Sequence, residues 1–294
     1  VAKEKLKPII DVLDAESLFN STTWDWLAWS ANYYRAALGD VLFQALPVKL
    51  RNGENAVKND RTFWRITDLG KQALESGELK RAKKQIEALS LLLTQDLEKG
   101  NNEISSAIWS ALKGKDYVEE IIVPTEQKSW QQALGDNPLV NLDNRLTLNK
   151  QQALAFSQLL FQEGFNVWLL EGVTGSGKTE IYLQYIEEVL KKGKQVLVLV
   201  PEIGLTPQTV RRFQARFNVE IDVLHSNLND TQRLNVWERA RTGQSAIVIG
   251  TRSALFTQFS DLGLIILDEE HDGSFKQQDG WRYHARDLGI VLAQ

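Results

Sequence analysis

The sequence predicts an α/β fold, in which a parallel-sheet P-loop lobe fills the C-terminal half and a mostly helical, winged-helix-like domain precedes it. From Arg145 onward, short apolar runs without polar alternation recur between helical stretches, a pattern typical of strands that are buried on both faces of a sheet. A glycine-rich loop follows the first run directly, and an acidic pair follows the last. The runs are Val167–Leu170, Gln195–Val200, Ile221–Leu224, Ala246–Ile249 and Leu264–Leu267.

The glycine-rich loop reads G-V-T-G-S-G-K-T and predicts a nucleotide site. Its glycines let the backbone aim N–H groups at phosphate oxygens, and the helix expected from Lys178 adds its positive dipole end. Lys178 is expected to reach the terminal phosphates, and the Thr179 hydroxyl to bind Mg²⁺. A chance glycine-rich turn is the alternative, but the flanking strand and helix favour nucleotide binding. The loop residues predicted to bind the nucleotide are Gly172, Val173, Thr174, Gly175, Ser176, Gly177, Lys178 and Thr179.

The acidic pair lies in the stretch L-I-I-L-D-E-E-H, which ends at His271. Asp268 is positioned to hold Mg²⁺, directly or through water, and Glu269 to orient and deprotonate the attacking water. Two surface carboxylates after a strand are the alternative, but a P-loop upstream in the same sheet favours hydrolysis. The predicted catalytic residues are therefore Lys178, Asp268 and Glu269.

Bulk composition limits the class of protein. The chain has 294 residues, more than one hydrophobic core usually organises, so we expect two or more domains. No apolar run has the length of a membrane span and the N-terminus lacks a signal-peptide pattern, which predicts a cytoplasmic protein without a membrane partner. The chain has no Cys, which excludes disulfides and thiolate zinc sites within it, and no Met, which indicates a fragment of a longer protein. A net charge of −4 does not decide on a nucleic-acid partner, because binding follows local patches.

The N-terminal half begins with an aromatic segment. Helical spacing of Trp26, Trp29, Tyr33, Tyr34 and Leu38 predicts one helix with a broad aromatic face. Such a face can stack on bases or pack into a core, and we favour the core.

The stretch up to residue 123 suggests a winged helix or a related helix-turn-helix module. Thr62–Thr67 alternates like a short strand, helical stretches follow around residues 80–93 and 103–112, and Tyr117–Val123 is an apolar run. The basic start of the first of these helical stretches, Lys80–Lys84, is either a solvated face or a DNA contact. Pro124–Asn144 resembles a polar connector, so we place a domain boundary there.

Several motifs then give a specific resemblance. D-E-E-H is a spelling found in superfamily 2 helicases, and further helicase-like motifs follow the predicted strands. Their combination closely resembles the PriA family of bacterial replication-restart helicases, also called primosomal protein N-prime. The resemblance is strongest from Leu146 to Asp287 and looser at Gly39–Pro47. The motifs are Asn149–Gln152, Val200–Gln208, His225–Asp230, Gly250–Phe256 and Gly273–Asp287.

The resemblance implies an ATP- and Mg²⁺-dependent enzyme that translocates 3′ to 5′ on single-stranded DNA, recognises stalled or abandoned forks and initiates primosome assembly. It implies forked and single-stranded DNA, primosome proteins and single-stranded-DNA-binding protein as partners, and a nucleoid-associated location. It also implies that Gln152 reads adenine. A second RecA-like lobe with an arginine finger and a zinc module belong to the family plan, but this chain has no cysteine ligands for zinc.

The family plan divides the chain into four parts. Residues 1–70 are expected to be the end of a 3′-end DNA-binding domain with a helical linker, 71–123 a winged-helix-like domain, 124–145 a connector, and 146–294 a truncated RecA-like first helicase lobe. Since hydrolysis needs positive charge from a second lobe or a partner, we expect this chain to bind ATP or ADP with little or no turnover.

The resemblance and the residue types together predict DNA contacts. Polar residues after strands can grip phosphates without reading sequence. Aromatic and basic residues after the acidic pair can stack on bases and meet phosphates, which would couple DNA to hydrolysis, and the alternative is a hydrophobic plug within the lobe. The predicted contacts are Thr206, Gln208, Thr251, Arg252, Phe275, Lys276, Trp281, Arg282, Tyr283 and His284.

Two other functions stay open at this point. Another superfamily 2 motor, such as a restriction-enzyme translocase or an RNA helicase, has the same loop and acid box. A DNA- or protein-binding module that senses a nucleotide without doing work is the second.

Overall fold

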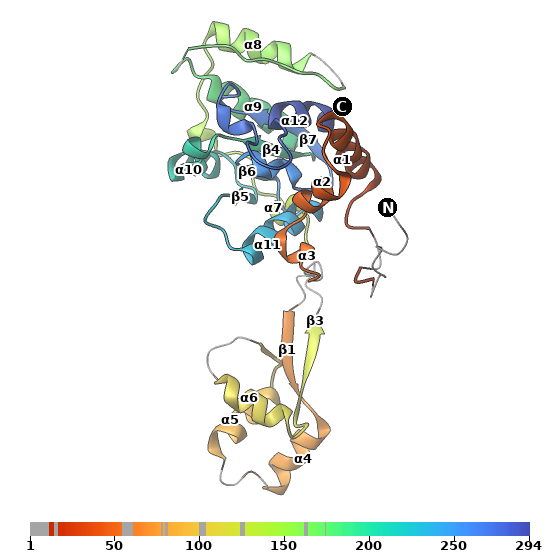
Figure 1. The fold of residues 1–294 in the computed structure, drawn as a ribbon. Coiled ribbons are helices and arrows are strands. Elements are labelled where there is room, and N and C mark those ends of the chain that lie inside the picture. Colours follow the sequence, from red (N-terminus) through yellow and green to blue (C-terminus); the bar gives the residue numbers. More distant parts are fainter. Residues whose placement is uncertain are drawn as a thin grey trace, which may run out of the picture. The chain divides into compact units, whose positions relative to one another are not determined.

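A four-stranded parallel sheet with the order β5-β6-β4-β7 forms the centre of the larger of two units (Figure 1). The computed structural model describes residues 12–14, 17–54, 61–77, 79, 82–99, 104–123, 127–161, 164–173 and 175–294. The larger unit comprises residues 1–56 and 128–294, and the smaller comprises 57–127. The strands are β4 (Gln195–Leu199), β5 (Ile221–Leu224), β6 (Ile247–Gly250) and β7 (Leu262–Leu267). Four of the five strands predicted from apolar runs are therefore confirmed.

Helices cover both faces of this sheet, and the central strands β4 and β6 are buried at every position, as the unbroken apolar runs predict, whereas most of β5 and β7 is partly buried. Side chains alternate along β4, so that Val196 and Val198 face one core while Leu197 and Leu199 face the other. Helices α7, α9 and α10 cover the first face, and α1, α2, α11 and α12 cover the second. Their bounds are α1 Ser21–Tyr33, α2 Leu38–Ala45, α7 Trp130–Leu134, α9 Lys178–Lys191, α10 Pro207–Arg216, α11 Asp230–Arg241 and α12 Ala285–Ala293.

The predicted first strand, Val167–Leu170, is wrong, because this segment forms no strand among the described residues. Val167 is 58% and Leu169 72% exposed, and β7 is the edge of the sheet on this side. An apolar run reports a tendency to be buried, but it does not name the neighbour with which a strand must pair. The segment connects α8 (Lys150–Leu160), which packs on α9, to the glycine-rich loop.

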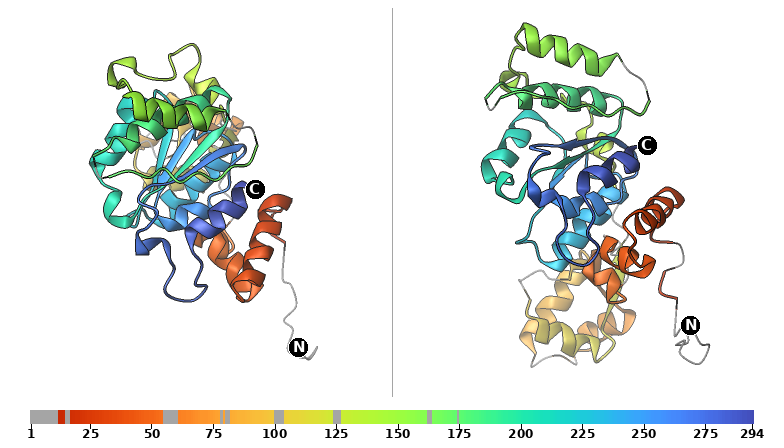
Figure 2. Two further views of the ribbon diagram at one scale, coloured as in Figure 1. Left: turned by 90° about the horizontal axis from the view of Figure 1, so that it is seen from above. Right: turned by 45° about the horizontal axis from the view of Figure 1, so that its top comes forward.

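The N-terminal aromatic segment forms α1 and α2 instead of one helix, and α3 (Val48–Arg51) follows. Both α1 and α2 contribute to the core of the second face, and Figure 2 shows them beside α12. Trp26 is buried, which agrees with core packing, whereas Trp24 and Tyr33 are 44% and 59% exposed. The remainder of Leu6–Leu13 before residue 12 lies outside the described residues.

The segment expected to be a polar connector packs on the sheet unit. Trp130 is 3% exposed, and its backbone N–H donates to the Gly243 carbonyl at 2.8 Å. Val140 forms an isolated bridge with Phe217. The short 3-10 helices of this unit are η2 Leu142–Asn144, η3 Glu202–Gly204, η4 Arg252–Phe256 and η5 Gly273–Phe275.

The smaller unit combines a three-stranded antiparallel sheet, ordered β2-β1-β3, with three helices. Its core contains Trp64 and Trp109, whose rings stack at 5.3 Å. The unit starts at residue 57, before the expected boundary at 71, because β1 pairs along its whole length with β3. Lys80 and Arg81 lie outside the described residues. The elements are β1 Arg61–Ile66, α4 Asp68–Ser76, α5 Lys83–Leu92, β2 Leu97–Glu98, α6 Ser106–Lys113 and β3 Val118–Val123.

Within the described ranges, every helix is too short or too polar to cross a lipid bilayer.

Candidate functional site

The four parallel strands bring their carboxyl ends to one edge of the sheet, where α/β proteins bind ligands. His225 follows β5, Thr251 follows β6 and Asp268 follows β7. The glycine-rich loop reaches the same region because α9 begins there. Predicted site residues from separate parts of the sequence therefore lie at the same edge of the sheet.

Two glycines of the glycine-rich loop adopt a backbone conformation that other residues disfavour. Gly175 and Gly177 have φ values of 80° and 82°, in the left-handed region that side chains disfavour. Gly177 also caps α9, and a Cβ there would lie 2.3 Å from Nε2 of Gln152. Thr174 lies outside the described residues.

Two groups in this loop fit an anionic ligand. The Lys178 Nζ donates to the carbonyls of Gly172 and Val173, so the cation is folded back into the loop. The Ser176 Oγ is buried and has no hydrogen-bond partner among the described residues. A phosphate at the N-terminus of α9 would give both groups an acceptor.

A tyrosine joins the loop helix to the acid box. Tyr182, one turn after Lys178 on α9, donates from its hydroxyl to Oδ2 of Asp268 at 3.1 Å. Burial, with the Asp268 carboxylate, raises the pKa of Tyr182, so the hydroxyl stays a donor, while a hydrogen bond with the Thr179 side chain lowers that pKa in part. Thr179 and Asp268, the two residues predicted to bind Mg²⁺, thus share one neighbour.

Glu269 has an unusual backbone. Its φ is 52°, a left-handed value that is uncommon for a non-glycine residue. Its side chain is 52% exposed, and Oε2 lies 3.8 Å from Nε2 of His271. The turn after β7 therefore leaves the Glu269 carboxylate about half exposed to solvent.

The loop and the acid box face one cavity of about 1220 Å³. Gly172, Lys178, Asp268 and Glu269 all line it, although the segment before the loop is not a strand of the sheet. A Mg²⁺-bound triphosphate fits this lining, because a lysine and two carboxylates face the same space.

Gln152 connects α8 to the loop. Its Nε2 donates to the Ser176 carbonyl at 2.8 Å, and its Oε1 accepts from the N–H of Asn149 in a capping box. Its predicted contact with adenine stays a prediction.

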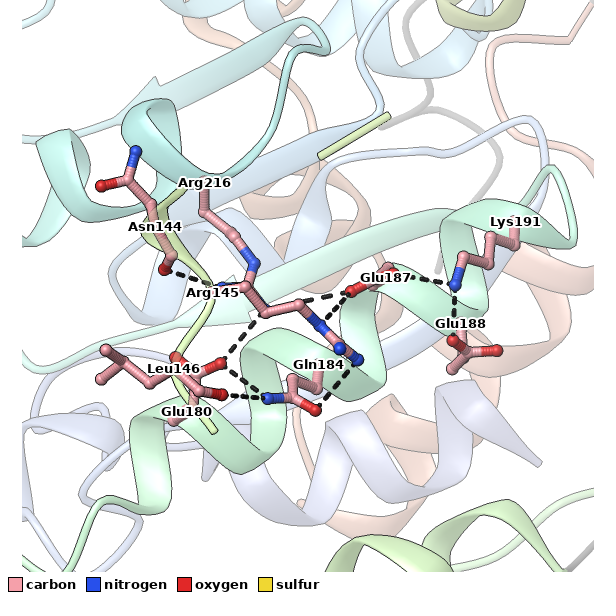
Figure 3. Close-up of polar contacts among 9 residues, drawn as sticks. All are labelled: Asn144, Arg145, Leu146, Glu180, Gln184, Glu187, Glu188, Lys191 and Arg216. Atoms are coloured by element: carbon pink, nitrogen blue, oxygen red, sulfur yellow. Dashed lines mark hydrogen bonds and ion pairs between the residues drawn. The ribbon is translucent and has the colours of Figure 1, made fainter. Parts of the chain in front are cut away.

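A charged network with a buried centre, shown in Figure 3, lies along α9, the helix that follows the glycine-rich loop. Arg216 from α10 is 1% exposed and donates to Glu180 of α9 at 3.1 Å and to the Asn144 carbonyl at 2.8 Å. Glu180 also accepts from Gln184, and Glu187 lies 3.3 Å from Arg145. Sequence reasoning missed this network, although polar residues at helical spacing on an apolar face of α9 are a signal for it.

A second cavity, of about 680 Å³, lies at the same sheet edge. Thr206 and Thr251 line it, as does Arg233, which was not among the predicted residues. The Thr206 hydroxyl accepts from the Thr209 N–H and so caps α10, while Gln208 is exposed.

Arg252 is partly buried, and its guanidinium donates to the loop that follows the acid box. One Arg252 Nη donates to the carbonyls of Ser274 and Lys276 at 2.7 and 2.8 Å. The residue therefore braces that loop, and a phosphate contact would require these bonds to be exchanged.

The aromatic residues after the acid box form the hydrophobic plug in this structure. Phe275, Trp281 and Tyr283 are 0%, 2% and 3% exposed, and they pack with Phe256 and Trp26. Burial raises the pKa of Tyr283 to about 12. Stacking of these three rings on DNA requires the loop to leave this position, whereas Arg282 is exposed and Lys276 and His284 are partly so.

Comparison with known proteins gives the class and then the family. Residues 149–293 match the DEAD/DEAH box helicase family, in agreement with the loop, the acid box and the parallel sheet. Residues 1–47 match the PriA 3′ DNA-binding domain. The chain belongs to the PriA family of replication restart proteins.

The relatives are longer than this chain. It is 78% identical over 294 residues to replication restart protein PriA of Haemophilus influenzae, a match that covers all of this chain and 40% of that protein. It is 34% identical to the protein of the same name from Buchnera aphidicola, again over all of this chain and 40% of the relative. For Bacillus subtilis PriA the identity is 48%, over 51% of this chain and 19% of the relative.

Proposed function

We propose that this chain is the ATP-binding part of a DNA helicase that moves 3′ to 5′, recognises stalled or abandoned forks and initiates primosome assembly. The supporting observation is the Tyr182–Asp268 hydrogen bond, which holds the acid box beside the helix that starts at Lys178. Forked and single-stranded DNA, primosome proteins and single-stranded-DNA-binding protein are the proposed partners.

Each residue has a role in this proposal. Lys178 leaves the loop carbonyls to bind the terminal phosphates, and the left-handed Gly175 and Gly177 keep the loop open for them. Thr179 and Asp268 hold Mg²⁺, which when bound neutralises phosphate charge. Glu269 orients the attacking water and accepts its proton.

The DNA contacts are proposed for two surfaces. In the larger unit, Thr206, Gln208 and Thr251 surround the second cavity or its rim, where phosphates can be gripped without reading sequence. The smaller unit, 57–127, is the proposed winged-helix-like domain. A zinc site is proposed for the longer protein alone, since this chain has no cysteine to supply thiolate ligands.

The proposal predicts that Lys178→Ala weakens nucleotide binding. Losing a charge-assisted contact to phosphate costs about 1.5–3 kcal/mol, so the Kd for Mg-ADP should rise about 10- to 150-fold in a titration with a fluorescent nucleotide. The matched control is Lys192→Ala, an exposed lysine directly after the other end of α9. Unchanged affinity in Lys178→Ala would remove the proposed site.

A second measurement separates the proposal from its alternatives. ATP hydrolysis by the longer protein should be stimulated by forked DNA more than by RNA, and the same protein should separate strands. Stimulation by RNA would indicate an RNA helicase, and nucleotide binding without strand separation would indicate a sensing module. The chain by itself should turn over ATP slowly or not at all, because hydrolysis needs positive charge on the far side of the γ-phosphate, and the family plan assigns that charge to a second lobe.

A further inference from the structure

Tyr34, the residue that caps the C-terminal end of α1, contacts the loop that follows the acid box. We infer that Tyr34 is a positioning residue that holds this loop in its docked state, and so couples the N-terminal DNA-binding region to ATP hydrolysis. The inference rests on the proposed function. Residues 1–47, which match a 3′ DNA-binding domain, include Tyr34 and all of α1.

Tyr34 makes three contacts with residues that lie about 250 positions later in the sequence. Its hydroxyl accepts from the N–H of His284 at 3.1 Å and donates to Oδ2 of Asp287 at 3.3 Å. Its ring lies 5.2 Å from the Lys276 ammonium. These partners stand at both ends of the loop, since Lys276 and His284 also form an isolated bridge with each other.

A polar chain continues from Tyr34 to the acid box. Asp287 accepts from Arg286 at 3.4 Å, and Arg286 pairs with Glu270 at 3.1 Å. Glu270 is the neighbour of Glu269, whose φ of 52° makes its orientation sensitive to the turn that carries it. A displacement of Tyr34 can therefore reach the residue that orients the attacking water.

Apolar contacts also hold the loop that follows the acid box, and they favour two discrete states of that loop. The Trp26 Nε1 donates to the Leu288 carbonyl at 2.9 Å, and its ring lies 5.8 Å from that of Phe256. Phe256 in turn packs on Trp281 and Tyr283 at 5.3 and 5.1 Å. Packed cores do not deform continuously, so the loop is either docked with its rings buried or released with its rings available for bases.

Tyr34→Phe tests this role, because it removes the hydroxyl and keeps the ring. Tyr33→Phe is the matched control, since that side chain is next in sequence, is 59% exposed and keeps its stack on Trp29 in the variant. The first readout is amide hydrogen exchange of the 294-residue chain, where residues 273–284 should exchange about three- to tenfold faster in Tyr34→Phe than in Tyr33→Phe.

The second readout is ATP hydrolysis by the longer natural protein. Tyr34→Phe loses the two hydrogen bonds of the hydroxyl, so the DNA-independent kcat should rise about three- to tenfold. Half-maximal activation should need less DNA, while KM for ATP stays unchanged. Damage to structure alone would lower basal and stimulated rates together, and that result would overturn the inference. Unchanged exchange, or faster exchange with wild-type kinetics, would overturn it as well.

Failure of the proposed function looks different in the same experiment. If DNA does not stimulate the wild-type protein or Tyr33→Phe, the helicase proposal fails, and the coupling inference falls with it. If both are stimulated normally and Tyr34→Phe matches them in exchange and kinetics, only the role of Tyr34 is refuted.

Discussion

Two tyrosine side chains connect separate elements at the edge of the sheet that carries the candidate site. Tyr182 ties the nucleotide helix to Asp268, and because burial raises its pKa, the bond persists across the physiological pH range. Tyr34 likewise connects the N-terminal helices to the loop after the acid box, through hydrogen bonds with His284 and Asp287. At both places a neutral tyrosine joins elements from distant parts of the sequence. A bound Mg²⁺ or DNA strand would have to displace or reorient that tyrosine.

His284 predicts a pH dependence of stability. Burial lowers its pKa below the usual 6.5, with Asp287 opposing that shift and Arg286 and Lys276 adding to it. Its Nδ1 also accepts from the Arg286 N–H at the start of α12, which only the neutral ring can do. The contribution is therefore complete above about pH 6.5 and is lost as the pH falls through the depressed pKa.

Denaturant unfolding between pH 7.5 and 5 checks this. The free energy of unfolding should fall more steeply with acidification in the wild type than in His284→Asn, because Asn is also a good N-cap and does not titrate. The control is His271→Asn, which replaces a side chain that is 76% exposed. Equal pH slopes in the wild type and His284→Asn would contradict the assignment.

At the scale of elements, α9 is held by charges buried beneath it. Arg216 is 1% exposed and reaches Glu180, the residue directly after Thr179 (Figure 3). Removing one partner of a buried ion pair leaves the other without compensation, which typically costs about 3–5 kcal/mol. Arg216→Met should therefore lower the free energy of unfolding of the larger unit by about that amount.

Two further variants test whether the loss of stability in Arg216→Met comes from the buried ion pair. Arg211→Met, on the exposed side of α10, should change stability by no more than about 0.5 kcal/mol. Adding Glu180→Gln to Arg216→Met should recover part of the loss, because it removes the uncompensated charge. If Arg211→Met and Arg216→Met destabilise equally, the network contributes nothing specific.

The elements also show what sequence can predict. Four apolar runs became β4 to β7 because their burial leaves a signal in the sequence itself, and Gly175 and Gly177 of the loop fall at left-handed positions for a similarly local reason. Val167–Leu170 carries the same signal but forms no strand, since pairing depends on a neighbour that the run does not encode. Arg216 and Tyr34 were missed because their partners lie far away along the chain.

At the scale of the whole molecule, the two units have separate cores. The larger has apolar clusters on both faces of its sheet, and the smaller has a cluster around Trp64 and Trp109. Each cluster draws its residues from one unit only, so each unit has the means to unfold cooperatively on its own. Nucleotide binding should then act on one of them.

Calorimetry of the 294-residue chain should accordingly show two transitions. At 100 times its Kd, Mg-ADP should stabilise the larger unit by about 2.7 kcal/mol and leave the smaller unit's transition in place. Trp109→Ala should do the reverse, lowering only the smaller unit by about 3–5 kcal/mol, because it opens the stack with Trp64. Lys178→Ala should abolish the nucleotide shift. A single transition that Mg-ADP and Trp109→Ala both move would mean that the units unfold together, and the assignment of the nucleotide's effect to the larger unit would fail.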